Sequence, residues 1–453
     1  MGDWRPDDGL DSLADQLAAG RTTSRALVEA CLERIAAPDG EGARVFPHGV
    51  AENALATADA QDQLRREGRI GSRFAGIPIS VKDNLDQAGQ VTRAGSRLLA
   101  GDAPAMTDAK VIARLRAAGF VLIGRTNMTE LAFSGLGLNP HYGTPANPRG
   151  TDAPRIPGGS SSGAAVSVAA HMAHAAVGTD TGGSCRIPAA FCGVVGFKPT
   201  ARRVPRGGVF PLSTTLDCVG SLTLSARDCA TMDAVMAGEA DAAPMVRGAA
   251  GLKLAALQGY VLHGLEPAAA AAYAAALDRL GAAGAVVVPL ELDALAETAR
   301  INARGGFSSA ELYALLRQRL ATDAHMLDPR VLKRVGFGAE HGPDAYAGFQ
   351  AARARLIAET ATVLDGFDAV LMPTTPLVAP RFDELERDEE YGRINGLALR
   401  NPSIANMLDR PAITLPCEPP GALPVGLTLM GASGQDRALL ALAAGVERAV
   451  RGL

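Results

Sequence analysis

The sequence lacks an excess of basic residues and any long apolar run. Its 44 lysines and arginines are outnumbered by 48 aspartates and glutamates, for a formal charge of −4, so it has no electrostatic footprint for nucleic acid. No apolar run approaches the roughly 18–20 residues that a membrane-spanning helix needs. The acidic N-terminal stretch has no apolar core of the kind found in signal peptides. We therefore expect a cytoplasmic protein with no nucleic-acid or membrane partner.

Paired cysteines are also missing. The six cysteines are scattered through 453 residues and none forms a C-x-x-C motif, which indicates reduced, mostly buried thiols rather than a disulfide framework. His171 and His174 are three residues apart, but no acidic residue or cysteine completes a ligand set nearby. We therefore predict no metal and no organic cofactor.

Strand-like and helix-like segments alternate in the first half of the chain. The apolar run at 74–81 predicts a buried strand that ends in a polar loop at Lys82. A helical pattern follows at 108–118, and 120–124 is again strand-like. This alternation predicts an α/β fold with helices on the faces of a sheet.

The second half has a different character. Residues 240–360 are mostly alanine-rich helix with two strand-like segments at 251–257 and 284–290, and more strands are expected from 368 onward. No repeat or linker marks a boundary. We therefore expect a single domain over 1–453, with its core at about 74–230 and 366–453 and a helical, variable elaboration at about 240–360.

Two glycine-flanked serine clusters are the main candidates for a site, GGSSSG at 158–163 and GTDTGGS at 178–184. Glycine permits positive φ angles and close backbone approach, so both are expected to be loops where a ligand meets main-chain N–H groups. The small-residue segment between them is predicted to form one helix carrying His171 and His174.

Several kinds of site fit such loops. The G-x-S-x-G motif at 159–163 makes Ser161 a candidate α/β-hydrolase nucleophile with His341 downstream, but two prolines stand where the required strand should be. A phosphate-binding loop fits 157–165, although no GK[ST] follows either cluster. Cys185 offers a thiol nucleophile without an evident base. Serines beside glycine commonly do no more than cap helices. The presence of two such clusters in matching context disfavours this simpler interpretation.

The longer pattern resembles the amidase signature family of serine hydrolases. The resemblance is carried by GIPISVKDN at 76–84, GGSSSG at 158–163 and GTDTGGSCRIPAAFCGVVGFKPT at 178–200. It is looser from 366 onward, where MPTTP, PAITLP and PVGLTLMG recur in the family's order. It implies one large α/β domain whose central mixed, twisted sheet is covered by helices on both faces. It also implies hydrolysis of a linear amide.

The resemblance implies a triad of Lys82 as base, Ser160 in a cis peptide bond as proton relay, and Ser184 as nucleophile. Such a lysine must be neutral, so we expect burial to lower its pKa from about 10.4 toward about 7–8. The family's oxyanion hole is formed by backbone N–H groups, here those of Thr181, Gly182, Gly183 and Ser184. Asp180 and Arg186 are expected to support this loop through charge-assisted hydrogen bonds.

The substrate pocket is expected beside the loop that follows Asn127. Four residues of this loop are predicted to line it: Phe133, Ser134, Gly135 and Leu136. Further candidates lie in the second half of the chain, namely Phe307, Tyr313, Tyr346 and Met372. Because most of these side chains are apolar, the sequence favours an aryl or alkyl amide over a dicarboxylic one.

The family resemblance leaves one alternative open. The A-type chain of the tRNA-dependent amidotransferase releases ammonia from glutamine within an assembly of several different chains. Its glutamine-binding segments are not recognisable at 300–360. We therefore expect a free-standing, cofactor-independent amidase that acts on a small-molecule amide and forms a homodimer.

Overall fold

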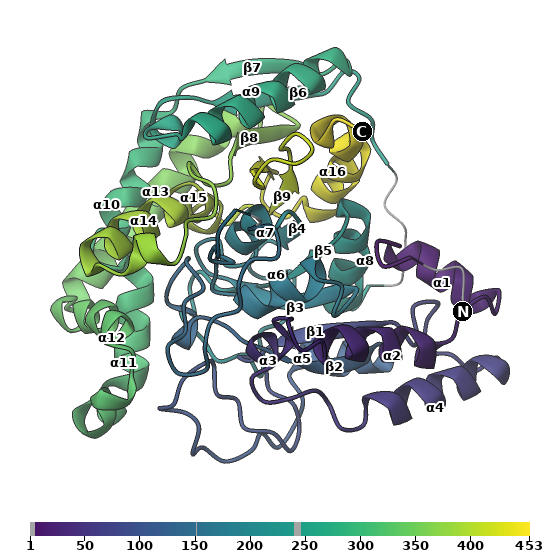
Figure 1. Cartoon of the computed structure of the whole chain (residues 1–453). Coiled ribbons are helices and arrows are strands. Elements are labelled where there is room, and N and C mark those ends of the chain that lie inside the picture. The colour runs from purple at the N-terminus through teal and green to yellow at the C-terminus, as the bar shows by residue number, and fades with distance from the viewer. Residues whose placement is uncertain (1–4, 151, 240–245) are drawn as a thin grey trace.

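One sheet runs through the computed structural model, which describes residues 5–150, 152–239 and 246–453. The sheet has ten strands in the order β2-β1-β3-β5-β4-β9-β10-β8-β6-β7 (Figure 1). The first five in the chain are β1 (Pro78–Lys82), β2 (Val121–Thr126), β3 (Ala175–Asp180), β4 (Val195–Lys198) and β5 (Cys218–Thr223). The others are β6 (Lys253–Leu257), β7 (Val286–Leu290), β8 (Ala369–Pro373), β9 (Ala412–Pro416) and β10 (Gly426–Met430).

The sheet is mixed. Strand β1 is parallel to both of its neighbours, β2 and β3, and β6 is parallel to β7 and β8. Between these two ends, β3, β5, β4, β9, β10 and β8 pair antiparallel. Parallel strands place their carboxyl ends at the same edge of a sheet, so the ends of β1 and β3 lie close together. The predicted lysine ends β1 and the second serine loop begins at the end of β3, while the first serine loop lies in the long connection after β2.

Helices cover both faces, as alternate residues of β3 show. Ala175 and Val177 pack with α1 (Leu10–Ala18), α5 (Lys110–Ala117) and α8 (Ala226–Ala237). Ala176, which points the other way, packs with α6 (Ser162–Ala169) and α7 (Arg186–Cys192). The predicted α/β architecture with a mixed sheet between helical layers is therefore confirmed.

The remaining helices extend these layers. Near the N-terminus lie α2 (Ser24–Ile35), α3 (Gly42–Val45) and α4 (Ala54–Arg66). The second half contributes α9 (Pro267–Ala282), α10 (Ala296–Asn302), α11 (Gly306–Asp323), α12 (Pro329–Gly336), α13 (Pro343–Leu364), α14 (Asp388–Arg400), α15 (Pro402–Met407) and α16 (Asp436–Arg451). Figure 1 shows α11, α12 and α14 together on the left of the molecule. None of the helices in the described ranges combines the length and apolarity needed to cross a bilayer.

The segment between the two serine loops differs from its prediction. Instead of one helix, it contains α6 and then β3. The helix ends at Ala169, and His171 has a left-handed backbone with φ of 54°. His171 and His174 therefore lie on a turn before β3, because pairing of Ala175–Asp180 with β1 and β5 overrides the helical preference of this alanine-rich stretch.

Several elements had no clear pattern in the sequence. These are α7, β5, α12, α14 and α15. Strand β5 contains Gly220 and Ser221, both unusual in an isolated strand, and becomes a strand because it pairs with β3 on one side and β4 on the other. The first residues of the predicted elaboration at 240–360, namely 240–245, lie outside the described residues. The rest of this segment adds β6 and β7 to the same sheet.

Candidate active site

Lys82 is the last residue of β1 and its side chain is fully buried. Its Nζ donates to Ser160 Oγ at 2.8 Å and to Thr179 Oγ1 at 2.8 Å. Thr179 Oγ1 also accepts from Asn84 Nδ2 at 3.1 Å. Burial lowers the pKa of Lys82 to about 8, against the weaker opposing influence of Asp180 and Asp217. The pKa of the lysine therefore lies about one unit above pH 7, so that a minor but substantial fraction of it is neutral there.

The first serine loop holds Ser160 against this lysine. The Gly159–Ser160 peptide bond is cis. The loop is fixed on both sides, because Gly159 N–H donates to Gly135 O at 2.8 Å and Ser160 O accepts from Thr129 N–H at 3.0 Å. Ser160 itself is fully buried. Its hydroxyl thus lies behind the surface, within reach of the lysine.

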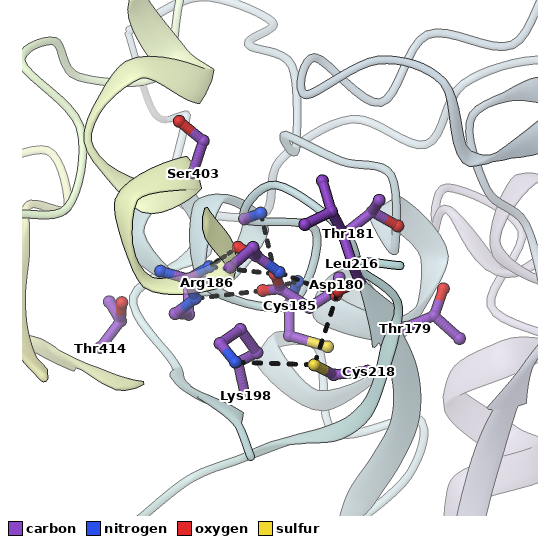
Figure 2. A network of polar contacts seen from close by, with 12 residues as sticks. Thr179, Asp180, Thr181, Cys185, Arg186, Lys198, Leu216, Cys218, Ser403 and Thr414 are labelled. Atoms are coloured by element: carbon purple, nitrogen blue, oxygen red, sulfur yellow. Dashed lines mark hydrogen bonds and ion pairs between the residues drawn. The ribbon is translucent and has the colours of Figure 1, made fainter. Parts of the chain in front are cut away.

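The second serine loop connects β3 to α7. Asp180 ends β3 and is fully buried with Arg186, whose Nε and Nη2 donate to the two carboxylate oxygens at 3.1 and 3.0 Å (Figure 2). The same carboxylate accepts from the backbone N–H groups of Gly183 at 2.8 Å and Cys185 at 3.0 Å. Burial alone would raise the pKa of Asp180, but Arg186 outweighs it and holds the pKa at about 2. The loop is therefore wrapped around a permanent ion pair.

The predicted oxyanion donors divide into two groups. Gly183 N–H is already used by Asp180. The N–H groups of Gly182 and Ser184 have no hydrogen-bond partner among the described residues, and both residues line a cavity. Thr181 also lines it, while its hydroxyl donates to Asp217 Oδ1 at 2.5 Å. Two free N–H groups thus border the space in front of Ser184.

The cavity has a volume of about 720 Å³ and lies over the second serine loop. Phe133 and Ser134 contribute to its wall. Gly135 and Leu136, predicted to line it as well, lie behind that wall. Gly135 O holds Gly159, and Leu136 packs in a buried cluster with Ile187. The structure thus brings the first two residues of this segment to the cavity and not the last two.

The aromatic and methionine candidates from the second half do not reach the cavity. Phe307 and Met372 are buried in a core cluster against which Tyr346 packs, and Tyr313 packs on another. Much of the cavity lining instead comes from α12 and α14, two helices without a clear sequence signal. All five described basic residues that line the cavity come from these two helices: Arg330, Lys333, Arg334, Arg393 and Arg400.

The alternative nucleophiles and ligands lie elsewhere. Ser161 is buried and donates its hydroxyl to Thr179 O at 3.2 Å. His341 contacts Arg304 O at 2.9 Å and does not line the cavity. Burial raises the pKa of the Cys185 thiol, which disfavours a thiolate. Within the described ranges, no three residues of the metal-binding types come together.

Three residues of the network had no signal in the sequence. Thr179 is the second acceptor for Lys82. Asn406, on α15, donates to both the carbonyl and the carboxylate of Asp180 at 3.0 Å and accepts from Arg186 at 2.7 Å. Lys198 is a second buried lysine whose Nζ donates to Pro199 O at 2.6 Å and contacts Cys218 Sγ at 3.5 Å (Figure 2). Asn406 is 226 residues from Asp180, so no local pattern could pair them.

Known proteins resemble this chain along nearly its whole length. A 2-amino-5-chloromuconic acid deaminase from Comamonas testosteroni is 35% identical over 96% of the chain and 95% of its own length. The A-type chain of the glutamyl-tRNA(Gln) amidotransferase from Chloroflexus aggregans is 35% identical over 94% of the chain and 92% of its own length. The structure of the peptide amidase from Stenotrophomonas maltophilia superposes with a TM-score of 0.78 at 31% identity, covering 98% of this chain and 97% of that one.

The amidase family matches residues 26–440. This range contains Lys82, both serine loops and the helices that line the cavity. The sequence motifs, the mixed sheet and the similar proteins all indicate the same family. The chain therefore belongs to the amidase family, the serine hydrolases of the amidase signature.

Proposed function

We propose that this amidase cleaves the C–N bond of a small-molecule carboxylic amide with Ser184 as nucleophile, Ser160 as proton relay and Lys82 as base. The observation that carries this proposal is the contact of 2.8 Å between Lys82 Nζ and Ser160 Oγ in a fully buried setting. A second support is that Ser184 borders the cavity whereas Ser160 lies behind it.

We propose a proton path that includes the contact between Lys82 and Ser160. Neutral Lys82 accepts the proton of Ser160, and Ser160 accepts that of Ser184 as Ser184 Oγ attacks the carbonyl carbon. One proton passes back from Lys82 through Ser160 to the leaving amine when the C–N bond breaks. A water molecule then attacks the ester formed with Ser184, with the same residues accepting its proton, and releases the acid.

The charge on the carbonyl oxygen needs donors in the transition state. The free N–H groups of Gly182 and Ser184 are the donors we propose, and each such hydrogen bond is typically worth about 3 kcal/mol in the transition state. Thr181, which lines the same wall, is a third candidate. Gly183 N–H serves the loop instead, through its bond to Asp180.

Asp180 and Arg186 act on this reaction through position. Their paired charges are buried and tied to Asn406, and a buried ion pair held by several hydrogen bonds keeps one geometry. We propose that they keep the two free N–H groups aimed at the same point without touching the substrate.

Labelling with a fluorophosphonate tests the nucleophile. We expect one adduct, located on Ser184 by peptide mass spectrometry, together with ammonia release from simple amides. Ser184→Ala is expected to lose the label, while Ser161→Ala keeps it. An adduct on Ser161, or none on folded wild-type protein, would contradict the assignment.

A second candidate is supported by the 35% identity to an amidotransferase A-type chain over 94% of the chain described here. In that case the protein would release ammonia from glutamine only in the presence of partner chains. A glutaminase assay on the purified protein, combined with size-exclusion chromatography, separates the two proposals. Amide hydrolysis by the isolated chain favours the free-standing enzyme.

We further propose that the enzyme works in the cytoplasm as a homodimer. All six cysteines are free and buried, which suits a reducing compartment. The dimer is a prediction that light scattering on the eluting protein tests directly, and a monomeric mass would contradict it.

A further inference from the structure

The cavity at Ser184 has lining residues of two kinds. Phe133, Leu212 and Leu216 are apolar. Basic side chains come from α12 and α14, and Asp388 is the acidic residue among the described residues that line it. An apolar pocket for an aryl or alkyl amide would not need these positive charges, which therefore call for an explanation.

Most of these cations already have partners. Arg330 pairs with Asp388 at 2.7 Å, and Arg393 pairs with Glu390 at 2.9 Å. The guanidinium of Arg400 is held by three hydrogen bonds, to the carbonyls of His263 and Val261 and to the side chain of Asn401. Each of these three arginines therefore already has hydrogen-bond partners before any substrate enters.

Arg334 differs from the other arginines. Its guanidinium carbon lies 4.6 Å from the centre of the Phe133 ring. Its Nε is buried and has no hydrogen-bond partner among the described residues, and no carboxylate in that part of the chain pairs with its side chain. Burial lowers the pKa of Arg334, but an arginine stays charged in proteins.

A partly buried cation without a partner is costly, because it gives up water without gaining a counter-charge. The natural compensation is an anion that enters with the ligand. Arg334 stacks on Phe133, and both residues line the same cavity as Ser184. An anion bound here would sit in the same cavity as the reacting carbonyl.

We infer that Arg334 binds a carboxylate of the substrate, so that the amide hydrolysed at Ser184 also carries a free acid group. This rests on the function proposed above and names its substrate class. A planar carboxylate matches the fork of a guanidinium. The chain between the two groups of the substrate then contacts Phe133, Leu212 and Leu216.

The neighbouring Lys333 supports this assignment. It also lines the cavity and has no ion-pair partner among the described residues, but its side chain is exposed. It therefore adds positive potential at the entrance, which attracts an anionic substrate. Asp388 does not cancel this potential because it is paired with Arg330.

Two matched series of amides test the inference by ammonia release. Glutaramate and adipamate carry the carboxylate, and 5-oxohexanamide and 6-oxoheptanamide replace it with a neutral methyl ketone of similar shape. We expect wild-type kcat/KM to be at least about tenfold higher for the acids. Arg334→Gln should lower kcat/KM for the acids by about 10–100-fold, mainly through KM, and abolish the preference.

Two further variants serve as controls. Arg334→Lys keeps the charge without the fork and should recover part of the preference. Arg387→Gln removes an exposed arginine that does not line the cavity, and its kinetics should match the wild type. A wild-type preference for the ketones, or an equal loss on both series in Arg334→Gln, would overturn the inference.

A binding experiment separates this inference from the catalytic proposal. Calorimetric titration of glutaramate into Ser184→Ala and into Ser184→Ala/Arg334→Gln needs no turnover. Binding that is weakened about 10–100-fold by the second change supports the carboxylate site even if no amide is hydrolysed. Equal binding by both proteins refutes it even if the nucleophile is correct.

Discussion

The base proposed here predicts a specific pH profile. Only neutral Lys82 can accept a proton, so kcat/KM should rise about tenfold per pH unit below the pKa and level off above it. With the pKa lowered to about 8, the rise should end near pH 8. The perturbations to compare are a change of pH in the wild type and replacement of the side chain in Lys82→Met.

The size of the effect on kcat/KM follows from the lowered pKa of Lys82. With a pKa of about 8, about one lysine in eleven is neutral at pH 7, whereas with the ordinary value of 10.5 about one in three thousand would be. Burial thus increases the active fraction about 300-fold, equivalent to about 3.4 kcal/mol at about 1.36 kcal/mol per pKa unit. Lys82→Met, which has no base, should lose at least as much in kcat/KM at pH 7.

The assay is initial-rate ammonia release from one amide between pH 6 and pH 10, with product release shown not to limit the rate. A profile that is flat in wild type over this range would refute the reasoning. So would a break near pH 8 that persists in residual activity of Lys82→Met, since the titrating group would then be another residue.

The same shift affects stability, with a definite sign. A lysine whose pKa is lower in the folded chain than in the unfolded chain binds fewer protons when folded, so stability rises with pH between about 8 and 10.5. The penalty on the folded state is about 3 kcal/mol at pH 7 and about 1.4 kcal/mol at pH 9.5. The free energy of urea unfolding of wild type relative to Lys82→Met should therefore gain about 2 kcal/mol between these pH values.

Three further changes test the surroundings of the triad. Gly183 has φ of 128°, and an added Cβ would lie 2.5 Å from Pro402 Cβ. Gly183→Ala should therefore displace the loop and lower kcat at least about 100-fold. Unchanged steady-state kinetics would show that the loop tolerates the added methyl group. Thr179→Val removes a hydroxyl that accepts from charged Lys82, so the break in the pH profile should move to lower pH, and Thr179→Ser should restore it; a break that stays in place contradicts the role. Asp180→Asn leaves a buried guanidinium without its carboxylate and should cost about 3–5 kcal/mol of unfolding free energy, and an unchanged urea midpoint would argue against it.

The sequence was informative where function depends on local motifs. Lys82, Ser160 and Ser184 lie in glycine-rich or strand-ending segments whose spacing is recognisable without a structure. The alternation of strands and helices predicted an α/β sheet for a similar reason, since buried strands must be apolar along their whole length, whereas the mixed order was implied by the family resemblance.

The part of the cavity lined by α12 and α14 could not be predicted in this way. Arg334 lies in the segment PRVLKRVG at 329–336, which has the pattern of an ordinary amphipathic helix with a solvated basic face. Only the packing of Val331 and Val335 into the core turns the basic residues of this helix toward the cavity. Asn406 is similarly a lone asparagine until the fold brings it to Asp180.

The bond between Asn406 and Asp180 has a consequence for how the enzyme is made. A ribosome synthesises Ser184 long before α14 and α15, which supply one wall of the cavity and the third partner of the buried ion pair. A growing chain thus carries the proposed nucleophile without a finished site around it. We therefore expect hydrolytic activity to arise late in synthesis, when the C-terminal segment docks.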